Sequence, residues 1–378
     1  MSVPEAERLA RVGLSLLTEP GDARVAAVVA DVGAQVLYDN VLAQRDDSEV
    51  RRDARSRLEG CDPVRQLEQA TRAGLRFVVP GDTEWPTQLD DLALAPPLQQ
   101  RGGAPLGLWV RGPLRLDGLG SSVAVVGSRS ATTYGADVAA QVAAVVARSG
   151  APVVSGAAFG IDQAAHRGAL GGGGTTIAVL ACGADRVYPQ AHRELIEHLA
   201  REGAVVSESP PGGAPTRVRF LSRNRIIAAL TSGTVVVEAA VRSGALNTAN
   251  WATRLNRHLM GVPGPITSAP SQGVHQLLRS GAATLVTSGQ EVLEMVAPAG
   301  QHVLEEPRGR ERSRDRLSMS DQQVLDAVPV SRAVGADSVA RTAGMALLKV
   351  GPALDRLRAG GYVEREEDGW RLAALAQE

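Results

Sequence analysis

Lysine is almost absent from this chain of 378 residues: only Lys349 is a lysine, and the other 39 of the 40 basic residues are arginines. A phosphate-loop nucleoside triphosphatase needs a GxxxxGK motif followed by Ser or Thr, and its lysine must reach the phosphates. Val350 follows Lys349, so the sequence excludes that motif. The single lysine also leaves almost no room for Schiff-base catalysis.

Cysteines, aromatic residues and long apolar runs are scarce as well. Cys61 and Cys182 belong to no CxxC or Cys/His pattern, so we expect neither a disulfide framework nor a structural zinc site, and a reducing cytosol fits. Aromatic residues make up 3% of the chain, which predicts an aliphatic, alanine-rich core. No run approaches the roughly 18 uninterrupted apolar residues of a membrane helix. The N-terminus has no signal-peptide pattern, so we expect a cytoplasmic protein without a membrane partner.

The net charge of −1 hides an uneven distribution along the chain. Residues 121–297 carry 14 arginines and 10 acidic residues, whereas residues 1–120 carry 14 arginines and 18 acidic residues. Within residues 207–260, seven arginines are accompanied by only two acidic residues, Glu208 and Glu238. A local excess of positive charge on a nearly neutral protein predicts one site for an anionic ligand.

Changes in hydrophobic pattern divide the chain into five parts. Short β-branched runs alternate with Ala-rich amphipathic stretches in the third part, which is typical of βαβ units and a parallel sheet covered on both faces. We therefore predict an α/β fold. The parts are a helical domain (1–75), an irregular connector with one strand at Leu106–Val110 (76–120), the α/β core (121–297), a charged linker (298–318) and a small terminal unit (319–378). The predicted core strands are 123–126, 152–155, 176–180, 204–207, 234–238 and 258–262.

In a doubly wound sheet, ligands bind where loops leave the carboxyl ends of strands. The loop after the first core strand contains Gly127, Ser128 and Arg129 and precedes a helix that we expect from about Ala136. Small residues let backbone N–H groups approach an anion, and an arginine can grip a phosphate through two N–H groups. The loop is not a GxGxxG dinucleotide motif. It predicts an anion-binding loop, with a plain tight turn as the alternative.

The loop after the second core strand begins with Ser155 and Gly156, where the backbone can again approach a ligand closely. Asp162 is a candidate cap for the next helix. His166 on that helix is more readily explained as a hydrogen-bonded structural histidine than as a catalytic one.

The densest cluster of candidate ligand-binding residues follows the fourth core strand. Within nine residues it contains Arg217, Phe220, Arg223, Asn224 and Arg225. If residues 219–230 are helical, Phe220, Arg223 and Asn224 share one face, because residues three and four apart are neighbours on a helix. Such a face suits a nucleobase stacked above a phosphate. The alternative is a solvated basic face with Phe220 in the core.

A second phosphate cradle is predicted after the next strand, where Ser243, Gly244 and Thr248 surround the start of a helix. Glu208 and Glu238 either orient arginines or supply a catalytic group. Beyond Glu238 the motifs show no nucleophile with an adjacent base and no metal-ligand cluster. We therefore expect a binding protein rather than an enzyme, without cofactor or metal.

Several motifs occur in an order that resembles one family. VAVVGSR, VSGAAFGIDQAAH, TIAVLACGADRVYP, SESPPG, RNRIIAAL, VEAAVRSGALNTA and VPGP follow one another. Together they resemble the DNA-processing protein A family (DprA, also called Smf) over about residues 75–297. The resemblance implies an extended Rossmann-like domain that binds single-stranded DNA and, more loosely, an N-terminal sterile-alpha-motif-like domain. It also implies a bacterial cytosolic homodimer that protects single strands and helps to load the recombinase RecA during natural transformation.

Motifs and resemblance together give one set of expected DNA-binding residues. They are Gly127, Ser128, Arg129, Ser155, Gly156, Arg217, Phe220, Arg223, Asn224, Arg225, Ser243, Gly244 and Thr248. The chain departs mildly from the family pattern. His192 stands where Asn is common, and Arg217 replaces a frequent Lys, which keeps the charge but changes its geometry.

The last part predicts three helices and then two short strands, an order that resembles the winged-helix domain of some family members. Its third helix offers Lys349, Arg356 and Arg358, but four acidic residues lie between 364 and 368 in the expected wing. An acidic wing disfavours a strong grip on phosphates. Contact with a protein and weak contact with DNA both remain open.

Two other classes of function stay as alternatives. A phosphoribohydrolase-like enzyme would use Gly-Thr and Glu near a late strand, and Gly233, Thr234 and Glu238 echo that pattern without its preceding glycines. A ligand-sensing regulator would combine a Rossmann-like pocket with a DNA-reading winged helix. Binding of mononucleotides rather than oligonucleotides would favour either of these.

Overall fold

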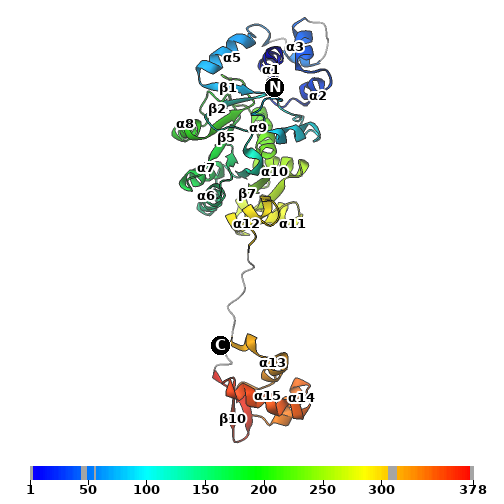
Figure 1. Cartoon of the computed structure of the whole chain (residues 1–378), viewed down its shortest axis with the longest axis vertical. Coiled ribbons are helices and arrows are strands. Elements are labelled where there is room, and N and C mark those ends of the chain that lie inside the picture. Colours follow the sequence, from blue (N-terminus) through cyan, green and yellow to red (C-terminus); the bar gives the residue numbers. More distant parts are fainter. Residues whose placement is uncertain (1–2, 44–48, 55–56, 305–312, 375–378) are drawn as a thin grey trace. The chain divides into compact units, whose positions relative to one another are not determined.

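In the computed structural model, which describes residues 3–43, 49–54, 57–304 and 313–374, the β-branched runs become strands of one large sheet (Figure 1). The nine strands of this sheet within those residues have the order β1-β2-β6-β5-β4-β3-β7-β8-β9. All neighbours from β6 to β9 are parallel, so the predicted α/β fold with a mostly parallel sheet is confirmed. The strands are β1 Leu75–Val78, β2 Leu108–Arg111, β3 Val123–Val126, β4 Val153–Ser155, β5 Thr176–Leu180, β6 Ala204–Ser207, β7 Gly233–Val236, β8 His258–Gly261 and β9 Thr284–Leu285.

Each of the six strands predicted between residues 123 and 262 is present, with ends shifted by at most two residues. The ninth strand, β9, was not predicted. It consists of two exposed residues, and a strand this short shows no alternation of apolar and polar residues.

The prediction of an irregular connector over residues 76–120 with a single strand is wrong. Strands β1 and β2 pair antiparallel with each other, and β2 pairs antiparallel with β6, so this segment extends the sheet. The rings of Phe77 and Trp109 lie 4.4 Å apart between centroids and are buried. Two of the few aromatic side chains thus anchor the added strands to the core.

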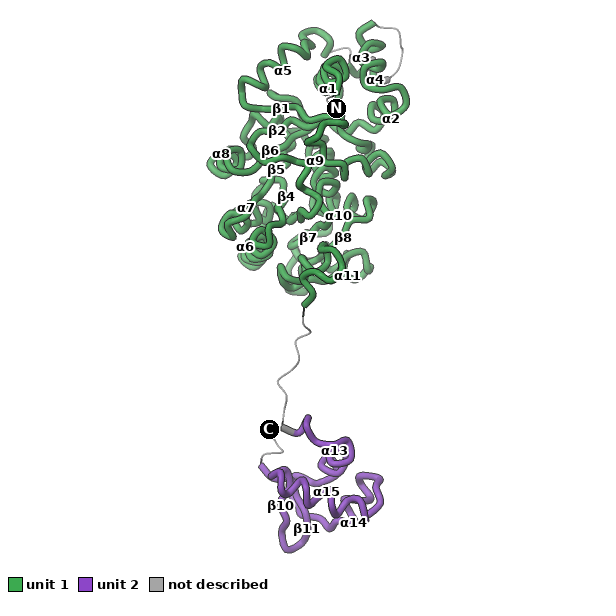
Figure 2. The backbone as a smooth tube through the Cα atoms, in the orientation of Figure 1, with its two compact units in different colours: residues 1–304 green, residues 305–378 purple. Residues whose placement is uncertain are grey.

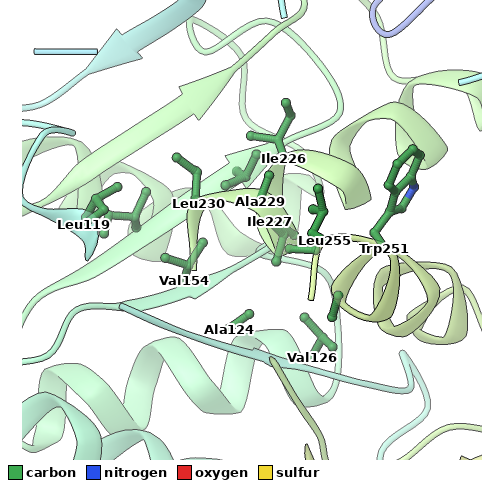
Figure 3. Close-up of a cluster of buried hydrophobic side chains, with 14 of the residues drawn as sticks. Leu119, Ala124, Val126, Val154, Ile226, Ile227, Ala229, Leu230, Trp251 and Leu255 are labelled. Carbon is green, nitrogen blue, oxygen red and sulfur yellow. The ribbon is translucent and has the colours of Figure 1, made fainter. Parts of the chain in front are cut away.

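Helices cover both faces of the sheet, as the alternation of strands and amphipathic stretches predicts. Val123 and Val125 face α6, α7 and α12, whereas Ala124 and Val126 face α9 and α10. Figure 3 shows the second face, with Ile227 of α9 and Trp251 of α10 above the strands. The helices are α6 Thr133–Arg148, α7 Ile161–Gly171, α8 Arg193–Glu202, α9 Arg217–Leu230, α10 Ala245–Arg254, α11 Gln272–Arg279 and α12 Gly289–Val296.

Helices also occupy the N-terminal part, as the sequence predicts. Asp22 and Asp62 accept hydrogen bonds from backbone N–H groups at the starts of α2 and α5, where carboxylates stabilise a helix. The bounds are α1 Glu5–Leu17, α2 Ala23–Val32, α3 Ala34–Leu42, α4 Glu49–Ala54 and α5 Pro63–Arg72. Their likeness to a sterile alpha motif stays a prediction.

The chain divides into two compact units, residues 1–304 and 305–378 (Figure 2). Residues 305–312 of the predicted linker lie outside the described residues. The second unit has three helices followed by an antiparallel hairpin, which is the predicted order, whereas its identity as a winged helix stays a prediction. Its elements are α13 Met319–Asp326, α14 Ala336–Ala343, α15 Leu347–Ala359, β10 Val363–Glu366 and β11 Gly369–Leu372.

Several charges of the second unit are already paired. Arg356 of α15 donates to Asp321 of α13 at 2.6 Å, which ties the two helices together. Arg371 forms ion pairs with Glu364 and Glu366 at 2.7 and 2.5 Å. These pairs reduce both the positive charge available on the third helix and the negative charge of the hairpin.

No single helix among the described residues is long and apolar enough to cross a membrane. Only α2 and α3 taken together, with a bend of 111° between them, meet the same criterion of length and composition.

His166 of α7 has the structural role that the sequence favours. The Thr176 hydroxyl donates to the Val153 carbonyl at 2.8 Å, so its oxygen accepts from Nδ1 of His166 at 2.7 Å. This arrangement keeps the neutral imidazole proton on Nδ1. Burial lowers the pKa of His166 from 6.5 to about 3.

We expect the free energy of unfolding to fall as the pH drops below about 6.5, because the unfolded chain takes up a proton on His166 that the folded chain excludes. Urea unfolding at pH 7 and pH 5 should show a smaller loss for His166→Gln than for the wild type. His302→Gln, at an exposed histidine, serves as the control and should behave as the wild type. Identical pH dependence for His166→Gln and the wild type would contradict the prediction.

Candidate nucleic-acid interface

A cleft of about 1030 Å³ opens at the carboxyl ends of the central strands. Its walls are the loop after β3, the first turns of α9 and the segment from β7 into α10. Ten of the thirteen predicted residues line it, namely Gly127, Ser128, Arg129, Arg217, Phe220, Arg223, Asn224, Ser243, Gly244 and Thr248. The structure therefore brings together side chains that lie up to 121 positions apart in the sequence.

The loop after β3 is held against the end of β7 by Glu238. The Ser128 N–H donates to the Glu238 carbonyl at 2.7 Å. The N–H and hydroxyl of Thr132 donate to the Glu238 carboxylate at 2.9 and 2.5 Å. Thr132 also accepts from the Gly135 N–H, so α6 begins at Thr133 and not near Ala136 as expected.

Glu238 does not orient an arginine, which is one of the two roles that the sequence left open for it. Its carboxylate is 1% exposed, is bound to Thr132, and is absent from the cleft lining. The expectation that it orients Arg223 or Arg225 is wrong, because the acidic partners of those arginines are Asp162 and Glu208. Glu238 instead shapes the loop that carries Arg129.

Phe220, in the first turn of α9, lies close to two guanidinium groups. The Arg129 Cζ is 4.5 Å from the Phe220 ring centroid, and the Arg223 Cζ is 5.8 Å from it. Thr216 caps the helix by accepting from the Arg219 N–H. The predicted shared face of Phe220, Arg223 and Asn224 is confirmed, because all three line the cleft.

Arg223 is a buried cation with unused hydrogen-bonding capacity. Its side chain is 7% exposed, and its Nη1 is 3.7 Å from Oδ2 of Asp162. Among the described residues, its Nε and Nη1 have no hydrogen-bond partner. Burial lowers the pKa of Arg223 and raises the pKa of Asp162. Buried donors are normally paired, so the arrangement favours an incoming anion.

Asp162 is a residue whose role the sequence misses, because it was taken only as a helix cap. The residue before α7 is Gly160, and Oδ2 of Asp162 accepts from the N–H groups of Gly156 and Ala158 at 3.2 and 3.4 Å. Gln99 also lines the cleft from the segment before β2. No motif in the sequence points to Gln99.

Three predicted residues do not line the cleft. Arg225 is fully buried, and its Nη1 and Nη2 each donate to Glu208 at 2.6 Å. It lies two positions from Arg223, which on a helix places it nearly on the opposite side. The Ser155 hydroxyl donates to the Val125 carbonyl inside the core, and Gly156 is buried beside Arg223.

The start of α10 closes the far wall of the cleft. The Asn224 amide donates to the Gly244 carbonyl at 3.2 Å and to Oδ1 of Asn247 at 3.3 Å. These bonds fix Gly244 one residue before α10, so the first N–H groups of that helix lie beside the cleft. A helix N-terminus favours a negative charge.

A family model for DNA recombination-mediator protein A matches residues 76–297, which include every lining residue of the cleft. The chain belongs to this family. The family resemblance of its motifs is thus confirmed. A putative DNA processing protein DprA of Mycobacterium tuberculosis is 41% identical over 362 residues, covering 95% of this chain and 92% of that protein. DprA of Streptococcus pneumoniae is 43% identical over 190 residues, covering 50% of this chain and 66% of that protein.

Solved structures of family members share the fold. The X-ray structure of DprA from Streptococcus pneumoniae aligns with a TM-score of 0.63 at 32% identity, over 79% of this chain and 99% of that one. The DNA processing protein A of Helicobacter pylori aligns with a TM-score of 0.51 at 26% identity, over 59% of this chain and 96% of that one. The Helicobacter pylori structure describes a single-stranded DNA binding mode.

We expect Arg225→Met to lower the free energy of unfolding by about 3–5 kcal/mol, because it leaves the Glu208 carboxylate buried without its partner. Arg223→Met should cost clearly less, since it removes a buried cation whose donors are only partly used. Urea unfolding followed by tryptophan fluorescence measures both. Equal losses for the two variants would contradict the different environments described for these arginines.

Proposed function

We propose that this chain binds single-stranded DNA in the cleft and acts as a recombination mediator. The observation that carries the proposal is the buried Arg223, which lies beside Phe220 and whose Nε and Nη1 have no hydrogen-bond partner among the residues that the structure describes. A phosphate oxygen is an acceptor that fits these donors, and the aromatic ring offers a base a surface on which to stack. The single-strand binding described for the Helicobacter pylori relative supports the same ligand.

The stacking residue favours a single strand over a duplex. A base that stacks on Phe220 must leave the stack of its own double helix, which costs a few kcal/mol unless the strand is already unpaired. Arg129 and Arg223 offer separate contacts to backbone phosphates around that ring, and the positive end of the α10 dipole favours a phosphate beside it. None of these groups reads a base edge, so binding should tolerate any sequence.

The proposed role needs binding groups and no chemical step. A mediator holds a strand and passes it on, and Glu238, the strongest catalytic candidate of the sequence, is bound to Thr132. By family membership we propose a homodimer that protects incoming strands and delivers them to the recombinase RecA during natural transformation.

Salt dependence of binding tests the proposal. We expect the wild-type protein to bind single-stranded oligonucleotides much more tightly than the matching duplex and to lose affinity steeply with salt. Arg129→Ala and Arg223→Met should each lower the slope of log K against log salt by about one. Arg148→Ala, an exposed arginine in the last turn of α6 and therefore at the opposite edge of the sheet, is the control and should leave the slope unchanged.

Phe220→Ala should act differently from the arginine variants. We expect it to weaken binding by about 1–3 kcal/mol through lost stacking, with the slope nearly unchanged. Equal affinity of the wild-type protein for duplex and single strand, or unaltered binding by all three variants, would overturn the proposal.

Glu238→Gln should lower DNA affinity without altering any turnover. The glutamine presents an NH₂ group where the carboxylate now accepts from both the N–H and the hydroxyl of Thr132, so the Arg129 loop loses an anchor. Incubation with nucleoside mono- and triphosphates, followed by chromatography, should detect no free base or phosphate. Release of base that disappears in Glu238→Gln would instead support the phosphoribohydrolase-like alternative.

A further inference from the structure

Among the described residues, three aromatic side chains outside the cleft lining are exposed although aromatics are rare in this chain: Tyr134, Phe159 and Tyr188. Phe159 is 47% exposed in the loop after β4, and Tyr188 is 41% exposed in the loop after β5. In parallel strands these loops leave the same edge of the sheet as the cleft. Phe159 and Tyr188 are therefore accessible to a base of a strand that leaves the cleft on this side.

Both rings continue the cleft in one direction. The centroids of Tyr188 and Phe220 are 5.9 Å apart, and Ala158, the neighbour of Phe159, lines the cleft. In the sheet, β3 is followed by β4 and then β5, away from β7. The two rings therefore extend the row that begins with Arg129 after β3 and Phe220 on α9.

The Phe159 ring packs against the buried side chain of His192. It meets His192 edge to face, with centroids 4.6 Å apart. His192 is buried, and its Nδ1 lies 2.9 Å from the Ala157 carbonyl. It is therefore hydrogen-bonded to the loop that carries Phe159. A ring that is already oriented loses little conformational entropy when a base stacks on it.

A positive charge accompanies the aromatic rings. Arg186 is exposed and lies two residues before Tyr188, and its Nη1 donates to the Gly212 carbonyl at 2.8 Å. Asp185 accepts from the Gly212 N–H at 3.0 Å. These bonds tie the loop after β5, which carries Arg186 and Tyr188, to the loop after β6.

We propose that Phe159, Tyr188 and Arg186 form a second DNA subsite, over which a single strand continues after it leaves the cleft. The inference rests on the proposed function, because the cleft must hold the strand for the subsite to extend it. Aromatic rings joined to a cation along one path are what sequence-tolerant binding of single strands requires. The subsite lengthens the strand covered by one copy of the chain and directs it toward β5.

Oligothymidylates of two lengths test the subsite, one of about four nucleotides and one of about twelve. For the longer strand, we expect Tyr188→Ala and Phe159→Ala each to weaken binding about 5- to 150-fold. For the shorter strand, which the cleft alone accommodates, the affinity should stay within about twofold of the wild type. Unchanged affinity for the short strand also shows that the variants remain folded.

Tyr134→Ala is the matched control. Tyr134 is an equally exposed tyrosine, 42%, whose hydroxyl donates to the Pro263 carbonyl at 2.6 Å, on the β8 side of the cleft. This variant should bind both strands as the wild type does. If Tyr134→Ala weakened binding of the longer strand as much as Tyr188→Ala, the proposal that the strand runs toward β5 would be overturned.

Crosslinking gives an independent readout. A strand with 5-iododeoxyuridine at one position after another should crosslink to Phe220 at some positions and to Tyr188 or Phe159 at others. Equal losses on both lengths, no loss on either, or crosslinks to Phe220 alone would overturn the subsite. Failure of the wild-type protein to bind either strand would instead overturn the proposed function. Normal DNA binding by both variants would point to a protein partner for these rings.

Discussion

The buried ion pair between Arg225 and Glu208 fixes the orientation of α9, and the cleft depends on that orientation. Arg225 is fully buried, and the Glu208 carboxylate also accepts from the Gly21 N–H at 3.2 Å. The pair therefore joins α9, the end of β6 and the turn between α1 and α2. Since separating such a pair is strongly unfavourable, α9 cannot rotate freely about its axis. Arg223 and Phe220 are held toward the cleft as a result.

Much of this arrangement can be predicted from the sequence, and the limits have physical causes. Strands β3 to β8 are visible because most of their residues are apolar and buried on both faces, so the signal is continuous. The shared face of Phe220, Arg223 and Asn224 follows from helical periodicity alone. Periodicity cannot say which arginine of a dense cluster is buried with a carboxylate. Arg225 was therefore grouped with Arg223, and Glu208 could not be distinguished from Glu238 as the carboxylate that pairs with Arg225. The β1–β2 pair was missed because Pro and Gly around it dominate the local pattern.

The cleft is organised before any ligand arrives. Asp162 offsets part of the charge on Arg223, but at 3.7 Å it leaves that guanidinium short of full hydrogen bonding. The loop after β3 is bound to Glu238, and α10 is set in place by Asn224. A ligand that satisfies Arg223 therefore has little reorganisation to impose, so more of its contact energy is expressed as affinity.

The cations that line the cleft are all arginines, and this limits how the cell can regulate them. A lysine can be acetylated, which removes its charge, but a guanidinium has no such ordinary modification and methylation leaves its charge in place. Its proton is also retained at any physiological pH. Because the only lysine, Lys349, lies in the second unit, acyl-transfer enzymes have no route to switch off the charge of the cleft. If the cleft holds DNA as proposed, release of the strand therefore depends on signals other than lysine acetylation, such as competing ligands, salt or the protein that receives the strand.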